Sequence, residues 1–200
     1  MNRLRACEAL HNIVPKAFLL FLALACTAMV SAAQTTALSP YQDEEDGVSA
    51  GGKWMQFRSV DKMTGAKRFR FELRSGSDPR EESDYEPRVE LFCSDGKFKQ
   101  AYFDTGSGLG PPNRPGFWGQ PQMQVLVRVD NTHESHGWNW VRGRFLSMDK
   151  GTVRGLIGAK VFKVQVETRS GQEIAEFSPA GLKLDRVKQA CALAPKKPSK

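Results

Sequence analysis

Cysteine and histidine are scarce in this 200-residue chain, which has four cysteines and three histidines. A Gly-x-Ser-x-Gly nucleophile motif is missing. The net charge is +7, yet no Lys/Arg run reaches the length that is typical of nucleic-acid-binding tails. These absences leave few residues for nucleophilic or metal chemistry, so we predict no catalytic residue, no metal or cofactor, and no nucleic-acid partner.

Residues 1–33 have the pattern of a cleavable signal peptide, in which a basic start precedes an apolar run. The run covers residues 17–30 and is too short to span a bilayer. Small residues follow it, so we predict cleavage after Ala32 or Ala33 and a periplasmic or secreted product without a transmembrane segment. An uncleaved anchor and a lipoprotein processed at Cys26 are the alternatives.

The predicted mature chain is mildly basic and keeps two cysteines. Cleavage takes three basic and one acidic side chain from totals of 29 and 22, which leaves a net charge of +5. Such a charge favours contact with anionic surfaces. Cys93 and Cys191 remain, and in an oxidising compartment such a pair normally forms a bond. We therefore predict a Cys93–Cys191 disulfide, with two buried free thiols as the alternative.

Period-two alternation of apolar and polar residues recurs through the middle of the chain and indicates strands with one buried face. The clearest case is Arg68 to Arg74, where Phe69, Phe71 and Leu73 share one face. Further strands are predicted at residues 54–59, 88–93, 97–104, 122–130, 160–168 and 174–177. Seven or eight short strands predict a mainly β fold, an antiparallel β-sandwich or an open barrel.

Helical spacing is confined to the C-terminus, where Leu184, Val187 and Cys191 fall on one stripe and Ser178 is the predicted N-cap. We expect this helix to be held on the sheet by the disulfide. The single β-rich domain is assigned to residues 53–193. The polar segment 34–52 is predicted to be a flexible leader, and residues 194–200 a disordered basic tail.

Two long polar segments interrupt the strands, at residues 75–87 and 104–121. The second is rich in Gly and Pro and carries Phe117 and Trp118. Loops of this length in a small domain are usually mobile or functional. We predict that Phe117 and Trp118 form a binding surface, while the alternative is that Trp118 folds back as a lid over the core.

The segment 130–140 carries His133, His136, Trp138 and Trp140. A His-x-x-His spacing lacks the i, i+4 geometry of a helical zinc motif, and the neighbouring Asn and Gly residues favour a turn. We predict solvated histidines rather than a metal site. Trp138 and Trp140 join the candidate binding residues.

Several short motifs together resemble a group of small exported proteins that includes the type VI secretion-associated accessory (TagO-like) proteins. The resemblance covers about residues 53–193. Its motifs are Asp61-Lys62-Met63-Thr64-Gly65, Leu91-Phe92-Cys93, Val127-Arg128-Val129-Asp130, the run Glu176-Phe177-Ser178-Pro179-Ala180-Gly181-Leu182, and Ala190-Cys191. The resemblance implies a β-sandwich with a terminal helix pinned by the two cysteines, and it implies no chemistry.

The function hypothesis that follows is an exported, non-enzymatic accessory or binding module that contacts another protein of the cell envelope. Long loops that present aromatic side chains over a rigid sheet favour it. One alternative is a small periplasmic hydrolase or metal enzyme around His133 and His136. Another is an envelope glycan or lipid binder, drawn by the net positive charge.

Overall fold

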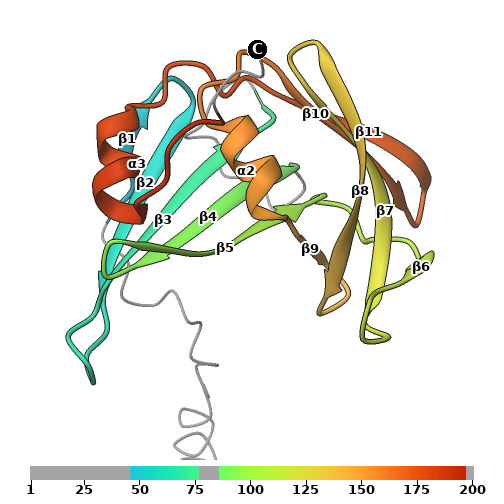
Figure 1. The fold of residues 1–200 in the computed structure, drawn as a ribbon, viewed down its shortest axis with the longest axis horizontal. Helices are drawn as coiled ribbons and strands as arrows, with labels where there is room; N and C mark the ends of the chain where they lie inside the picture. Colours follow the sequence, from blue (N-terminus) through green and yellow to red (C-terminus); the bar gives the residue numbers. More distant parts are fainter. Residues whose placement is uncertain (1–45, 77–85, 197–200) are drawn as a thin grey trace, which may run out of the picture. The chain divides into compact units, whose positions relative to one another are not determined.

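The computed structural model describes residues 46–76 and 86–196, which form one antiparallel sheet and two short helices (Figure 1). The fold is mainly β, as predicted. The first half of the sheet consists of β1 (Val48–Gly51), β2 (Trp54–Val60), β3 (Lys67–Arg74), β4 (Arg88–Ser94) and β5 (Lys97–Asp104). The second half consists of β6 (Arg114–Pro115), β7 (Pro121–Val129), β8 (Thr132–Val141), β9 (Phe145–Ser147), β10 (Phe162–Thr168) and β11 (Gly171–Phe177).

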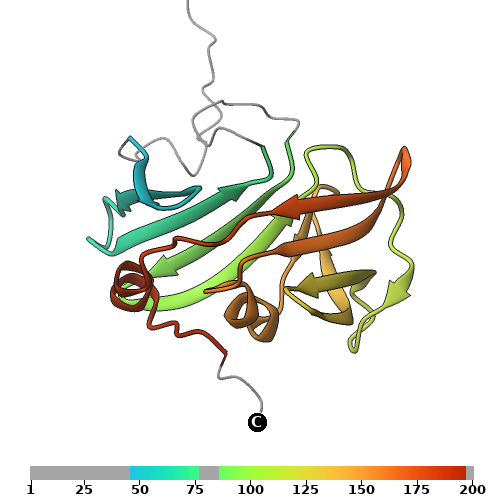
Figure 2. The ribbon, with the colours of Figure 1, turned by 90° about the horizontal axis from the view of Figure 1, so that it is seen from above.

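The strands follow the order β1-β2-β3-β4-β5-β9-β8-β7-β10-β11, and β6 pairs with β7. The sheet bends at the short β9, so that its two halves face each other across the core (Figures 1 and 2). In the described part of the chain the end strands β1 and β11 do not pair with each other, which leaves the barrel open.

The core is built from the apolar positions of the alternating strands. Phe71, Leu73 and Leu91 from the first half and Val127 and Val164 from the second are all buried. Because side chains alternate between the faces of a strand, the charged positions between them lie on the outer face of the sheet. The apolar positions of the predicted period-two pattern are therefore the positions that form the core.

The two helices lie on one side of the domain, α2 at Lys150–Leu156 and α3 at Leu184–Cys191 (Figure 2). The predicted disulfide is present, since Cys191 of α3 is bonded to Cys93 of β4 with a Cα–Cα distance of 5.1 Å. The predicted cap at Ser178 is wrong, because the helix starts at Leu184 and the carbonyl oxygen of Pro179 accepts a bond from Trp54 Nε1. Nothing in the pattern predicted α2, a seven-residue helix with two glycines.

Two ends of the predicted domain also differ from the sequence interpretation. Residues 48–51, assigned to the leader, form β1, because Ala50 is small enough to be buried and its carbonyl oxygen accepts a bond from Lys183 N. Lys196, assigned to the tail, donates its backbone N–H to the carbonyl oxygen of Arg154 at 2.9 Å. The predicted signal peptide and residues 34–45 lie outside the described residues, as do residues 77–85 within the loop predicted at 75–87, and residues 197–200.

Candidate functional site

Phe117 and Trp118 occupy the tip of the hairpin that joins β6 to β7. The tip is closed by two backbone bonds, from Gly116 N to Gln120 O at 2.8 Å and from Gly119 N to Gly116 O at 2.9 Å. Gly119 has a φ of +74°, a left-handed conformation that glycine adopts without strain. The two aromatic residues are thus the central positions of a defined turn.

The rings of this turn, which we call the Phe117–Trp118 turn, project into solvent. Phe117 is 89% exposed and Trp118 is 80% exposed, and the two rings touch edge to face with centroids 4.9 Å apart. Trp118 therefore is not a lid over the core. Large apolar side chains exposed together on a rigid hairpin are typical of a contact surface.

The Gly/Pro-rich segment before the turn is held along much of its length. Leu109 is buried and bridges to Thr168, while the Gly110 N–H bonds to the carbonyl oxygen of Glu167 at 3.1 Å. Asn113 N–H bonds to Gln122 O at 3.1 Å, just before β6. The backbone that carries the two rings is consequently anchored to β7 and β10.

Trp138 and Trp140 do not belong to this surface, which corrects the prediction for Trp138. Trp138 is 1% exposed, packs on Phe103 at a centroid distance of 6.1 Å, and donates its Nε1–H to Asp149 Oδ2 at 3.2 Å. Trp140 is half-buried against the core, and its Nε1 has no hydrogen-bond partner among the described residues. The segment is the strand β8 and not a turn, so its even positions face inward.

His133 and His136 lie on β8 three positions apart, and an odd spacing places two side chains on opposite faces of a strand. His133 is exposed on the outer face, whereas His136 lies beside the core next to α2. The two histidines therefore cannot bind one metal ion together. No group of three His, Cys, Asp or Glu side chains suited to a metal occurs within the described ranges.

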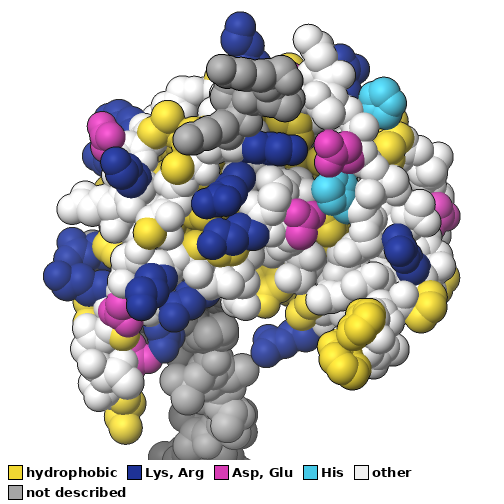
Figure 3. Space-filling model, viewed as in Figure 1, with side chains coloured by type: hydrophobic (Ala, Val, Ile, Leu, Met, Phe, Trp, Pro, Cys, Tyr) yellow, Lys and Arg dark blue, Asp and Glu magenta, His cyan; other side chains and the backbone are white. Residues whose placement is uncertain are grey.

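His136 lies in a groove of about 610 Å³ between β8 and α2, where it is flanked by two carboxylates. Its Nδ1 is 3.0 Å from Asp149 Oδ2, and its Nε2 is 3.6 Å from Glu134 Oε2. Figure 3 shows a histidine with acidic side chains on both sides of it on this face of the molecule. We call this set the His136 groove.

Asp149 organises the groove because it is the N-cap of α2. Its Oδ1 accepts the Thr152 N–H at 2.8 Å and its Oδ2 accepts the Thr152 hydroxyl at 2.6 Å. Burial alone would raise the pKa of Asp149, but these bonds, with the one from Trp138, outweigh burial and lower the pKa below its usual value. The carboxylate is thus held ionised beside His136.

The contacts in the groove hold the start of α2 beside β8. Both imidazole nitrogens face carboxylates, and the Thr152 hydroxyl is committed as a donor to Asp149, so it is not activated by the histidine. The sequence prediction of solvated histidines is wrong for His136. Asp149 and Thr152 were missed, although Asp-x-x-Thr before a short helix is an N-cap pattern that could have indicated them.

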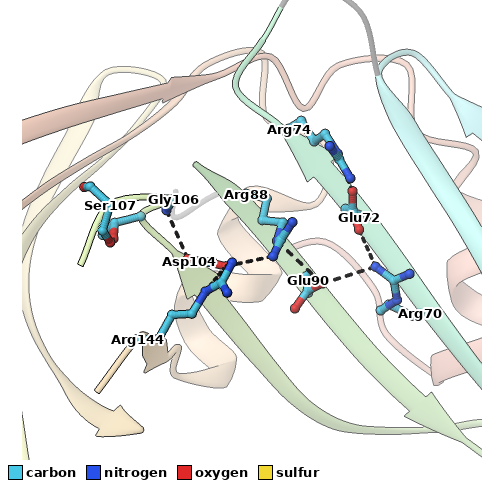
Figure 4. A network of polar contacts seen from close by, with 10 residues as sticks. Arg70, Glu72, Arg74, Arg88, Glu90, Asp104, Gly106, Ser107 and Arg144 are labelled. Carbon is cyan, nitrogen blue, oxygen red and sulfur yellow. Dashed lines mark hydrogen bonds and ion pairs between the residues drawn. The ribbon is translucent and has the colours of Figure 1, made fainter. Parts of the chain in front are cut away.

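A second polar cluster lies on the outer face of β3, β4 and β5 (Figure 4). Asp104 is fully buried, and its carboxylate accepts bonds from Arg88 Nη2, Arg144 Nε and Gly106 N, each at 3.0 Å. The remaining members are Arg70, Glu72, Arg74 and Glu90. Burial raises the pKa of Glu90, and the charges of Arg70 and Arg88 oppose that shift only in part. We call this set the Asp104 network.

Comparisons with known proteins add little to this geometry. No family model matches the chain, and neither does any curated protein. The crystal structure of invasion associated protein B from Bartonella henselae is similar at 13% sequence identity with a TM-score of 0.45. The match covers 72% of this chain and 96% of that one.

Proposed function

We propose that this protein is an exported, non-enzymatic accessory module of the cell envelope that binds another protein through the Phe117–Trp118 turn. The observation that carries the proposal is the pair of rings, 89% and 80% exposed, on a turn closed by backbone hydrogen bonds. A fixed backbone lowers the entropy cost of binding, and a few large aromatic side chains usually supply most of the binding energy at an interface.

Export is supported by the signal-peptide pattern of residues 1–33 and by the Cys93–Cys191 disulfide, since such bonds persist in oxidising compartments. Within the described residues, neither helix is long and apolar enough to cross a membrane. The periplasm or the extracellular medium is the location we propose.

The secretion-associated role is part of the same proposal and rests on the resemblance to TagO-like proteins. That resemblance implies a β fold whose terminal helix is pinned by two cysteines, and the Cys93–Cys191 bond ties α3 to β4 in this way. A shared architecture does not itself transfer a function. The proposal of a protein partner therefore depends on the Phe117–Trp118 turn and not on the shared architecture.

Site-specific photocrosslinking in cells tests the proposal directly. A photoreactive benzoylphenylalanine replaces Trp118 in one strain and Met63 in another, because Met63 is 94% exposed at the tip of a different hairpin. We expect irradiation to attach one defined envelope protein at position 118 and not at position 63. Equal patterns of adducts at the two positions would contradict the proposed binding surface.

A further inference from the structure

The outer face of the second half of the sheet presents its side chains in ordered rows, because the strand registers place named residues directly opposite each other. We call this surface the β7–β10 face. Across β8, β7, β10 and β11, the first row is His133, Arg128, Lys163 and Glu176, and the second is Ser135, Leu126, Gln165 and Ile174. The third row consists of two separate pairs, Gly137 opposite Gln124 and Glu167 opposite Gln172.

The first row brings cations together. Arg128 lies directly opposite Lys163, and like charges placed directly opposite each other destabilise a sheet. His133 lies opposite Arg128 on its other side. Lys163 has a partner in Glu176 at 2.6 Å. Arg128 Nε instead donates to the backbone oxygen of Asp130 at 2.8 Å, and this arginine has no acidic partner among the described residues. An anionic group bound here would relieve that repulsion.

The second row is exposed and partly apolar. Leu126 is 43% exposed and Ile174 is 65% exposed, with Gln165 between them. Both aliphatic side chains line a hollow of about 600 Å³ that also takes in Arg128, His133 and Lys163. The same hollow therefore offers an apolar contact next to the cations.

The third row borders a gap in the sheet. β10 pairs with β7 only as far as Gln165 opposite Leu126, and beyond that point Asn113 enters, its Oδ1 accepting the Gln124 N–H at 2.8 Å. A hollow of about 340 Å³ here is lined by the carboxamide side chains of Asn113, Gln124, Gln165 and Gln172, together with Ser135 and Glu167. Carboxamides both donate and accept hydrogen bonds, which suits the backbone of a peptide.

We propose that the β7–β10 face binds an extended peptide segment with an acidic residue two positions away from an apolar residue. Residues on the same face of a strand are about 6.6 Å apart, which is also the i, i+2 spacing of an extended peptide. A segment lying along β7 would place its carboxylate on Arg128 and Lys163, its apolar side chain on Leu126 and Ile174, and its backbone against the amides. Such a segment continues toward the Phe117–Trp118 turn, because that turn precedes β7.

This inference rests on the proposed function in taking the partner to be a protein, and it adds the chemistry of the partner's contact segment. An anionic lipid would satisfy the first two rows. The carboxamide side chains of the third row can form hydrogen bonds with a peptide backbone but not with an acyl chain. For that reason we favour the peptide.

A titration with a synthetic peptide tests the inference. The probe is the capped heptapeptide acetyl-Ser-Thr-Asp-Thr-Leu-Thr-Ser-amide, followed by the backbone amide signals of the ¹⁵N-labelled protein up to millimolar peptide. We expect shifts at Leu126, Arg128 and Gln165, and at least about fivefold weaker binding when Asn replaces Asp in the peptide. Absence of shifts, or equal binding of the two peptides, would overturn the inference.

Matched variants identify the contact. Arg128→Gln should weaken binding by about fivefold to tenfold, whereas Lys150→Gln, which removes an exposed cation from α2, should leave it unchanged. Leu126→Ser should also weaken binding, while Val60→Ser, at a residue of similar exposure on β2, should not. Equal effects within either pair would contradict the site.

Two further arms separate this inference from its alternatives. Vesicles with anionic lipid that retain the wild-type protein but not Arg128→Gln, with no peptide bound, would assign the face to a lipid and overturn the peptide proposal. The crosslinking experiment at position 118 separates the two proposals. If the peptide binds as described while benzoylphenylalanine at position 118 forms no adduct, the β7–β10 face stands and the proposed role of the turn fails.

Discussion

The two halves of the sheet share the same alternating sequence pattern and the same core, yet their outer faces differ. On β3, β4 and β5 the charged side chains of the Asp104 network are covered and paired, so that Asp104 is fully buried and Glu72 is 3% exposed. On β7 and β11 the outward positions are open, with Leu126 43% and Ile174 65% exposed. Charge at alternating positions therefore does not by itself mark a surface that is available for binding.

The physical difference lies in the partners of the charges. In the Asp104 network each of the three acids, Glu72, Glu90 and Asp104, faces at least one guanidinium, and these charges hold one another in place. On the β7–β10 face the cations of the first row have only one acid, Glu176, between them. We expect the first face to contribute to stability and the second to binding.

The largest expected effect comes from breaking the Asp104 network. Asp104→Ala should lower the free energy of unfolding by about 3–5 kcal/mol, because it leaves the Arg88 guanidinium buried without its closest carboxylate. Glu176→Ala, which removes the exposed pair with Lys163, should cost less than about 1 kcal/mol. Urea denaturation of both variants measures these losses. Similar losses of free energy of unfolding in the two variants would contradict the proposed difference between the two halves.

Removing the disulfide should have the next largest effect. The double variant Cys93→Ala, Cys191→Ala opens a link across 98 residues and should lower the free energy of unfolding by about 2–4 kcal/mol. Amide hydrogen exchange should then quicken in α3 and β4 and stay nearly unchanged in the β7–β8 hairpin. Uniform loss of protection across both halves would show that the bond supports the whole fold instead of one half.

Most strands could be predicted because one period-two pattern determines both their existence and their buried face. Phe69, Phe71 and Leu73 of β3 show this, and so does the β4–β5 hairpin. β8 was missed since Asn131, Gly137 and Asn139 favour a turn locally, while pairing with β7 along eight residues overrides that preference. The disulfide followed from the two cysteines that remain after the predicted signal cleavage and from the oxidising compartment expected of an exported chain.

The sites were harder to predict because they depend on contacts between distant parts of the chain. Phe117 and Trp118 stand out locally as aromatic residues between glycines, and their exposure agrees with the sequence. The bond of Asp149 to Trp138 and the burial of Asp104 by Arg144 arise only when β8, β9 and α2 meet. The local sequence therefore does not predict which charged side chain will be buried.

A smaller effect is expected at the His136 groove. Asp149→Ala removes the N-cap of α2 and the partner of Trp138, and should lower the free energy of unfolding by about 1–2 kcal/mol at neutral pH. Because the pKa of Asp149 is lowered in the folded state, the charge stabilises above the unfolded-state pKa, and this stabilisation is lost as pH falls through the folded-state pKa. Asp149→Asn keeps a capping side chain and is the control.

Denaturation at neutral pH and at a pH below the folded-state pKa measures this prediction. The difference between wild type and Asp149→Asn should shrink at the lower pH. A difference that is the same at both values would mean that the Asp149 charge does not contribute to stability.

The smallest effect on stability and the largest on binding should coincide at Trp118, and this is the central claim. Trp118→Ala should change the free energy of unfolding by less than about 0.5 kcal/mol, because the side chain is 80% exposed, while costing about 2 kcal/mol or more in affinity for the partner. Met63→Ala is the control at another hairpin tip, where the side chain is 94% exposed. The decisive measurement is the affinity for the partner and the melting temperature, both determined on the same preparations of the two variants. We predict that only Trp118→Ala loses affinity and that both variants keep the melting temperature of the wild type. Unchanged affinity in Trp118→Ala, or its unfolding, would contradict the account.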